Sequence, residues 1–146
     1  MASNPPLAWR PWRKAARAGR KLEDTSPDDH FHDVRKRAKQ ARYAAEAVAP
    51  ALDPDDRKLA MRFAKRAAGV QEVLGELQDS VVARSVVREV VAARSADAEF
   101  ALAAGRLLER QEQSAREARA AFPTAWKKLD KPKLRRWFRG SSQERW

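Results

Sequence analysis

Two short sequences, each a proline followed by two aspartates, precede the two longest stretches of this chain that contain no proline. Ser26 and Asp53 stand just before these prolines, and both residue types cap helices by accepting a backbone hydrogen bond. Proline is favoured at the first helical position, and the aspartates interact favourably with the positive end of the helix dipole. Pro50 closes the first stretch, because a proline inside a helix clashes with the preceding turn. The chain is therefore expected to form long helices, and Ser95 marks a further, weaker start.

These signals predict four main helices joined by short connections. The expected helices cover about residues 11–22, about 28–49, from Pro54 onward and from about Ala96 onward. The pattern leaves open whether the third helix breaks near Gly75 or continues to Arg94. Pro123 is expected to bend or end the fourth helix.

The third expected helix has apolar residues at three- and four-residue spacing, which is typical of a helix packed in a bundle core. They are Leu59, Phe63, Val70, Leu74, Leu77 and Val81. Short connections place neighbouring helices antiparallel. We therefore expect an all-α, antiparallel four-helix bundle of the up-and-down type, with a basic groove, as a single domain over residues 1–146.

The charge of the chain points to an anionic partner. It has 31 Lys and Arg against 20 Asp and Glu, a formal net charge of +11. Such an excess destabilises a compact state by self-repulsion, so it usually reflects a partner of opposite charge. Nucleic acid, an acidic membrane surface and inorganic polyphosphate all fit this requirement.

Other features narrow the location and chemistry of the protein. The chain has no cysteine, which excludes disulfides, thiolate nucleophiles and sulfur-ligated metals. It has no apolar run long enough to span a bilayer and no apolar stretch suited to a secretory signal. The simplest expectation is a cytoplasmic protein without a membrane partner.

The second expected helix concentrates the basic residues on one face. On a helical wheel, this stripe contains His32, Arg35, Lys36, Lys39, Arg42 and Tyr43. The opposite face is mostly alanine, so a neighbouring helix can approach closely and turn the stripe into the wall of a groove. Arginine offers several planar donors to phosphate oxygens and lysine a compact charge, which suits a linear polyanion. The alternative is a solvated basic face with no ligand.

A family resemblance adds to this interpretation. The stripe residues, with Glu46 after them and the sequence Leu74-Gly75-Glu76-Leu77-Gln78-Asp79 further along the chain, resemble a CHAD domain, the conserved histidine α-helical domain. The resemblance extends from about residue 9 to about residue 138. It implies a helical bundle that binds inorganic polyphosphate, associates with polyphosphate granules, has no catalytic activity and needs no cofactor.

The resemblance also implies which residues bind the ligand. His32 matches the histidine that gives the family its name. The matching basic ligands are Arg35, Lys36, Lys39, Arg42 and, on the third helix, Lys65. Arg62 and Arg66 lie near Lys65, and Arg66 is placed to reach the same groove. The alternative for these three residues is solvation, or pairing with Glu72 and Glu76. Tyr43 is expected to pack between helices rather than touch the ligand.

One departure from the family pattern concerns size. A complete member has two four-helix bundles, each with its own histidine helix, whereas this chain has one and resembles the second. The chain is then either a truncated copy or a half that pairs with a second CHAD half or forms a homodimer. A half-site is expected to bind shorter stretches of phosphate more weakly.

Signals for metal binding or catalysis are weak. His30 and His32 are two residues apart, so on a helix they point in different directions and cannot share a metal. The aspartate pairs are explained as partners of the helix dipole rather than as hydrolytic acids. The sequence contains no glycine-rich phosphate loop and no nucleophile elbow. We expect no enzyme activity and no metal site.

Both ends of the chain are basic. The N-terminal arm contains Arg10, Arg13, Lys14, Arg17, Arg20 and Lys21. The tail contains Lys127, Lys128, Lys131, Lys133, Arg135, Arg136 and Arg139, together with Trp137 and Phe138. Either arm can extend a polyphosphate path. For the aromatic residues we favour inward packing on the bundle over contact with nucleic acid or an acidic membrane.

The sequence thus predicts non-catalytic binding of inorganic polyphosphate along a basic groove, with an affinity that falls steeply with salt. The alternative function is sequence-nonspecific binding of nucleic acid, which uses the same electrostatics. Nucleic-acid binders usually present exposed aromatic residues or an element that enters a groove, and the stripe has only Tyr43. A third possibility is an assembly half whose charge serves only solubility.

Overall fold

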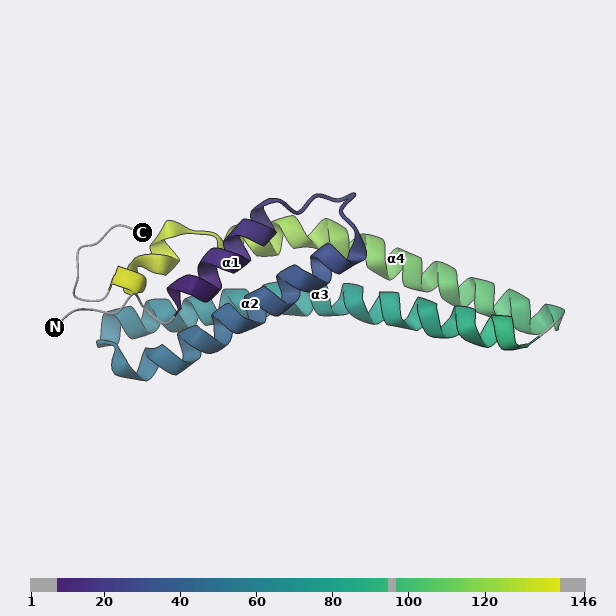
Figure 1. The fold of residues 1–146 in the computed structure, drawn as a ribbon, viewed down its shortest axis with the longest axis horizontal. Helices are drawn as coiled ribbons and strands as arrows, with labels where there is room; N and C mark the ends of the chain where they lie inside the picture. Colours follow the sequence, from purple (N-terminus) through teal and green to yellow (C-terminus); the bar gives the residue numbers. More distant parts are fainter. Residues whose placement is uncertain (1–7, 95–96, 140–146) are drawn as a thin grey trace.

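The computed structural model describes residues 8–94 and 97–139, and these residues form helices and short connections (Figure 1). In chain order the elements are α1 (Trp9–Arg20), α2 (Asp28–Val48), the 3-10 helix η1 (Ala49–Ala51), α3 (Pro54–Ala93), α4 (Ala98–Leu129) and the 3-10 helix η2 (Pro132–Arg139). No strand occurs in the described ranges, so the expectation of an all-helical fold is confirmed. No described helix is both long and apolar enough to cross a membrane.

The two proline-aspartate sequences do start helices, but by different means. Asp53 caps α3 as predicted, because its carboxylate accepts a hydrogen bond from the backbone N–H of Asp56 at 3.0 Å. The expectation that Ser26 caps α2 is wrong. The helix begins after Pro27 without a side-chain cap, and the Ser26 hydroxyl instead accepts from the backbone N–H of Glu23 at 2.9 Å. Ser26 therefore closes the turn before α2 rather than the helix itself.

Both long helices continue past the positions at which the sequence left a break or an end open. Helix α3 continues without a break through Gly75 to Ala93. Helix α4 is capped by Asp97, while Ser95 lies outside the described residues. Pro123 does not end α4, which continues to Leu129. The residues around this proline pack on the core, since Phe122 and Trp126 are both buried, and this packing offsets the lost backbone hydrogen bond.

Helix α3 is the central helix of the molecule. It lies against α2 on one side and α4 on another, and η2 packs on its first half. Helices α1 and α2 cover only one end of the α3 and α4 pair, which extends beyond them as a two-helix projection (Figure 1). Large apolar side chains are exposed along this projection: Val82, Val86, Val90, Leu102 and Leu107.

The core at the covered end is an aromatic cluster that joins both ends of the chain. Trp12 of α1 stacks on Trp126 of α4, with ring centroids 5.7 Å apart, and meets Phe63 of α3 edge-on at 5.5 Å. Trp137 and Phe138 of η2 are buried against Phe63. The predicted inward packing of the tail aromatics is therefore confirmed.

Gly19 allows α1 to approach α4 this closely. A Cβ atom at this position would lie 2.3–2.6 Å from ring atoms of Trp126, closer than any real contact. Because a larger residue would push the two helices apart, this glycine fixes the position of α1 and of the basic residues on it.

Candidate functional site

The apolar face of α2 is buried as predicted and brings this helix close to α3. Val34, Ala38, Ala41 and Ala45 are at most 1% exposed. Arg35 lies directly on α3 at Gly75, where an added Cβ would be 3.5 Å from the Arg35 Nε atom. Short side chains at this boundary thus place an arginine between the two helices rather than out in solvent.

We define the α2–α3 seam as His32, Arg35 and Arg42 of α2 with Gln71 and Gly75 of α3. Residues three, four or seven apart lie on the same face of a helix, which places His32 and Arg42 on the side of α2 that carries Arg35. By the same rule Gln71 lies one turn from Gly75 on α3. The seam therefore combines polar side chains from two helices along about three turns of α2.

Several polar atoms of the seam are buried without a partner. His32 Nδ1, Arg35 Nε, Arg42 Nε and Gln71 Oε1 form no hydrogen bond with any described residue. Buried side-chain polar atoms are nearly always paired, because an unpaired one costs the free energy of its desolvation. A bound oxyanion placed along the seam would supply acceptors for the arginine donors and for a protonated histidine.

The stripe residues outside the seam lie on its solvent side. Lys36 and Lys39 are exposed. Tyr43 is 49% exposed, so the expectation that it packs between helices is wrong. Its ring instead lies against two cations of the stripe, 4.9 Å from the Arg42 guanidinium carbon and 5.6 Å from Lys39 Nζ. This cation–π contact holds the two side chains on one surface.

Carboxylates neutralise little of this stripe. Glu46 lies 3.6 Å from Arg42 and is the stripe's one ion-pair partner among the described residues. Asp33, which also lies on α2, pairs at 2.8 Å with Arg37 outside the stripe. The other four cationic or titratable side chains of the stripe form no ion pair within the described residues: His32, Arg35, Lys36 and Lys39.

The basic residues of α3 face a different surface. Lys65 and Arg66 line an open hollow of ≈ 660 Å³ between α3 and α4, together with Lys128 and Glu72, and no residue of α2 borders it. Arg62 is exposed. The structure thus does not bring Lys65 and Arg66 together with the α2 stripe. The suggested alternative pairing of these residues with acids of α3 is not seen as an ion pair in the described chain.

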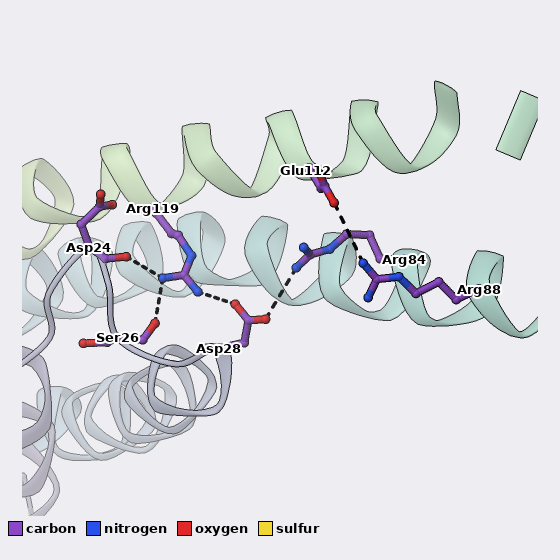
Figure 2. A network of polar contacts seen from close by, with 7 residues as sticks. All are labelled: Asp24, Ser26, Asp28, Arg84, Arg88, Glu112 and Arg119. Carbon is purple, nitrogen blue, oxygen red and sulfur yellow. Dashed lines mark hydrogen bonds and ion pairs between the residues drawn. The ribbon is translucent and has the colours of Figure 1, made fainter. Parts of the chain in front are cut away.

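A second arginine cluster, which sequence reasoning missed, has a structural role. Figure 2 shows Arg119 of α4 donating hydrogen bonds to the backbone carbonyls of Asp24 and Ser26 at 2.7 and 2.8 Å and to the Asp28 carboxylate. Arg84 of α3 reaches the same carboxylate at 3.6 Å (Figure 2). Asp28 and Arg119 are far apart in the sequence, so no local pattern could reveal this contact. This Asp28 cluster, formed by Asp28, Arg84 and Arg119 with the carbonyls of Asp24 and Ser26, joins the start of α2 to α3 and α4.

The described residues contain no group of three or more His, Cys, Asp or Glu side chains that could hold an ion.

Comparison with known proteins places the chain in a family. It belongs to the CHAD domain family, whose match covers residues 4–88. This family is associated in general with polyphosphate binding and is generally a non-catalytic binding domain. The matched part includes α1, α2 and most of α3, and therefore the whole α2–α3 seam.

Two similar proteins come from Mycobacterium tuberculosis. The uncharacterized protein MT2285 of strain CDC 1551 and the uncharacterized protein Rv2226 of strain H37Rv are each 34% identical to this chain over 129 residues. The alignment covers 85% of this chain and 23% of each relative, so the chain spans about a quarter of their length. No solved structure matches.

Proposed function

We propose that this chain binds inorganic polyphosphate, without catalysis, along the α2–α3 seam and the neighbouring Lys36 and Lys39. The observation that carries the proposal is the set of buried side-chain nitrogens of His32, Arg35 and Arg42 that form no hydrogen bond with described residues. They lie beside Lys36 and Lys39, which form no ion pair within the described residues. In this proposal the helices act as an antiparallel four-helix bundle, and its basic groove follows α2.

The spacing of the cations suits a linear polymer of charge. Arg35, Lys39 and Arg42 follow one another along α2 at steps of four and three residues, and a helix rises about 1.5 Å per residue. Successive cations are therefore about 5 Å apart along the axis and can each meet a phosphate group of one extended chain. Release of counterions from the polyphosphate would drive binding and make it weaken with salt.

The seam also holds its arginines in place before the ligand arrives. Arg35 lies against α3 at Gly75, and Arg42 lies against the ring of Tyr43. Side chains that are already positioned lose less conformational entropy on binding than freely moving surface cations do. This distinguishes the seam from the exposed basic residues elsewhere on the chain.

The wider assembly belongs to the same proposal. We infer that the chain corresponds to the second bundle of a two-bundle CHAD domain and pairs either with another CHAD half or with a second copy of itself. Association with polyphosphate granules in the cytoplasm would follow from the ligand. Lys65, with Arg62 and Arg66, would add charge on the neighbouring surface of α3 rather than within the seam.

Matched charge variants test the proposal. Arg35→Gln/Arg42→Gln removes two positive charges from the seam, and Arg106→Gln/Arg110→Gln removes two from exposed positions four residues apart on α4. Binding of long-chain polyphosphate is measured by calorimetry, with helicity and Tm checked by circular dichroism. We expect the seam variant to lose affinity about tenfold or more, since each lost contact involves a charged group, and the control to change by about twofold or less.

A second pair of substitutions protects the test against a folding defect. Lys36→Gln/Lys39→Gln changes only exposed side chains of the same stripe. We expect an intermediate loss of affinity with an unchanged Tm. Equal losses in all three double variants would mean that only the total charge matters, and the assignment of a specific seam would then be wrong.

A further inference from the structure

The basic N-terminal arm and the basic tail, which are far apart in the sequence, meet in the structure. Helix α1 and η2 border an open hollow of ≈ 270 Å³. Four arginines line it, and they are Arg13, Arg17, Arg20 and Arg135. We call this feature the α1–η2 hollow.

One carboxylate organises two of these arginines. Asp130, at the end of α4, accepts hydrogen bonds from Nε and Nη2 of Arg20, each at 2.8 Å, and from Nη1 of Arg135 at 3.1 Å. The hydrogen bonds and positive charge of Arg20, followed by the charge of Arg135, lower the pKa of Asp130. Both guanidiniums also lie over the buried ring of Trp12, at 6.0 Å for Arg20 and 4.9 Å for Arg135. These two side chains are therefore held in fixed positions.

The other two arginines are open. Arg13 and Arg17 are exposed, lie one turn apart on the face of α1 that carries Arg20, and form no ion pair with the described residues. The hollow thus brings four guanidiniums against one carboxylate. Crowding of positive charge is also visible in the buried member, since burial and the neighbouring charge of Arg20 lower the pKa of Arg135 despite the opposing effect of Asp130. An anion in the hollow would relieve this repulsion.

The hollow is separate from the α2–α3 seam. The other flank of α1, at Ala18 and Lys21, faces α2 near His30 and Asp33, so α1 stands between α2 and the hollow. The two sites share no residue. Asp130 and η2 also lie beyond residues 4–88, which match the CHAD family. The hollow therefore combines three arginines of α1, which lie inside the matched range, with Arg135 and Asp130, which lie outside it.

We propose that the α1–η2 hollow is a second, independent site for phosphate-type oxyanions. Arg20 and Arg135 form its fixed base, and Arg13 and Arg17 close on the ligand from α1. Guanidinium groups favour phosphate because their forked donors match its oxygens, and phosphate carries more charge per volume than a carboxylate. The hollow is smaller than the roughly 300–1,000 Å³ of sites for drug-sized ligands, which suits a small inorganic anion or the end of a phosphate chain.

A nucleotide fits this hollow less well. Two tryptophans line it. Trp12 is only 2% exposed and lies beneath two guanidiniums, so its ring offers no free face on which a base could stack. Trp9 is partly buried, and its ring meets that of Phe138 edge-on with centroids 6.2 Å apart. Stacking supplies much of the binding energy in single-stranded nucleic-acid sites.

The test is a titration of the full chain with inorganic tripolyphosphate in the Arg35→Gln/Arg42→Gln background, in which the seam is impaired. Adding Arg13→Gln/Arg17→Gln is expected to weaken the remaining binding about tenfold. Adding Arg106→Gln/Arg110→Gln, which removes the same charge from the α3 and α4 projection, is expected to change it by about twofold or less. NMR signals of the Arg20 and Arg135 side-chain N–H groups should shift with tripolyphosphate only where Arg13 and Arg17 are intact.

Three outcomes would overturn the proposal. The first is equal tripolyphosphate affinity in the Arg13/Arg17 variant and its control. The second is titration without any shift of the Arg20 and Arg135 signals. The third is equally tight binding of a triglutamate peptide, which would assign the hollow to carboxylates. These results are independent of whether the seam binds polyphosphate, since that is tested by Arg35→Gln/Arg42→Gln in the otherwise unchanged chain.

Discussion

The α2–α3 seam and the Asp28 cluster both contain partly buried arginines, but the partners of these arginines differ. In the Asp28 cluster, Arg119 donates hydrogen bonds to two backbone carbonyls and to a carboxylate, and Arg84 forms an ion pair with the same carboxylate. In the seam, the buried Nε atoms of Arg35 and Arg42 form no hydrogen bond with a described residue, and only Arg42 has an ion-pair partner, Glu46 at 3.6 Å. Arg84 Nε in the Asp28 cluster is also buried without a hydrogen bond, but the guanidinium of Arg84 has the Asp28 carboxylate as its partner. The comparison teaches that positive charge alone does not mark a ligand site. The marker is a positioned cation such as Arg35, whose Nε has no hydrogen-bond partner and whose charge has no carboxylate partner among the described residues.

The α1–η2 hollow stands between these two cases. Asp130 pairs with Arg20 and Arg135, as in a structural cluster, while Arg13 and Arg17 have no ion-pair partner in the described chain, like Arg35 of the seam. The fixed pair supports the fold and the open pair is available to a ligand. Substitutions can therefore separate structural arginines from ligand-binding ones on the same molecule.

The largest expected effect comes from removing both proposed binding surfaces. Because the seam and the hollow share no residue, losses of polyphosphate affinity from Arg35→Gln/Arg42→Gln and Arg13→Gln/Arg17→Gln should add as free energies to within about 0.5 kcal/mol. The variant with all four substitutions would then bind polyphosphate about a hundredfold more weakly than wild type if each pair of substitutions lowers the affinity about tenfold. Calorimetry on all four proteins completes the cycle. If the variant with all four substitutions binds polyphosphate as tightly as the seam variant does, the hollow takes no part in polymer binding.

A substitution in the Asp28 cluster should lower the stability of the fold and leave polyphosphate affinity nearly unchanged. Arg119→Gln leaves two backbone carbonyls and a carboxylate with a weaker partner, so we expect it to lower the free energy of unfolding by about 2–3 kcal/mol. Polyphosphate affinity of the folded protein should change by about twofold or less. Urea unfolding and calorimetry measure the two quantities. A large loss of affinity with unchanged stability would show that this arginine belongs to a ligand site.

Substitution of two glycines compares how closely the helices approach at the seam and where α1 meets α4. Gly19→Ala places a methyl group within 2.6 Å of the Trp126 ring, so we expect a loss of about 1–3 kcal/mol and weaker anion binding in the hollow. Gly75→Ala meets Arg35 at an ordinary 3.5 Å, so the better helix propensity of alanine should leave stability equal or raise it by up to about 1 kcal/mol. Thermal unfolding of both variants decides this. Similar Tm changes would contradict the close approach of α1 to α4.

The smallest effect concerns pH. The pKa of Asp130 is lowered in the folded protein by the hydrogen bonds and charge of Arg20, and by Arg135. A lowered pKa means that the stabilisation is fully present above the unfolded-state pKa of about 3.9 and is lost as pH falls through the folded-state value. Asp130→Asn should therefore cost about 1 kcal/mol at neutral pH, a modest figure because Arg20 is half exposed, and less in strong acid. Urea unfolding at pH 7 and pH 3 tests this. A cost that grows toward pH 3 would contradict the assignment.

Local features of the fold could be predicted from the sequence. The start of α3 at Pro54 follows from its capping residue Asp53, and the start of α2 at Asp28 follows from the proline before it and the aspartates in its first turn, although Ser26 does not cap it. The buried face of α2 follows from periodicity. These signals depend on neighbours a few residues apart. Inward packing of Trp137 and Phe138 was predicted because large apolar residues seldom remain exposed. Whether Pro123 ends α4 was left open by the sequence, which allowed either a bend or an end. The helix continues to Leu129 because core packing on either side offsets the lost hydrogen bond.

The candidate sites were predictable only in part. His32, Arg35 and Arg42 share a face of one helix, so periodicity alone places them together. The approach of Arg35 to Gly75, and the meeting of Arg20 with Asp130, depend on how separate helices pack. The same limit explains Lys65 and Arg66, which lie on the α4 side of α3 rather than in the seam. Tyr43 was misplaced because its cation–π partners compete with burial.

The central claim is that the seam recognises polyphosphate rather than any polyanion. Its most direct test is a titration of wild type and Arg35→Gln/Arg42→Gln with long-chain polyphosphate, single-stranded DNA and double-stranded DNA, matched in phosphate concentration and salt. We predict that wild type binds polyphosphate about tenfold or more tightly than either DNA, and that the variant loses this preference while keeping a weak, salt-sensitive affinity for all three. Equal binding of DNA by wild type, or an unchanged preference in the variant, would contradict the account.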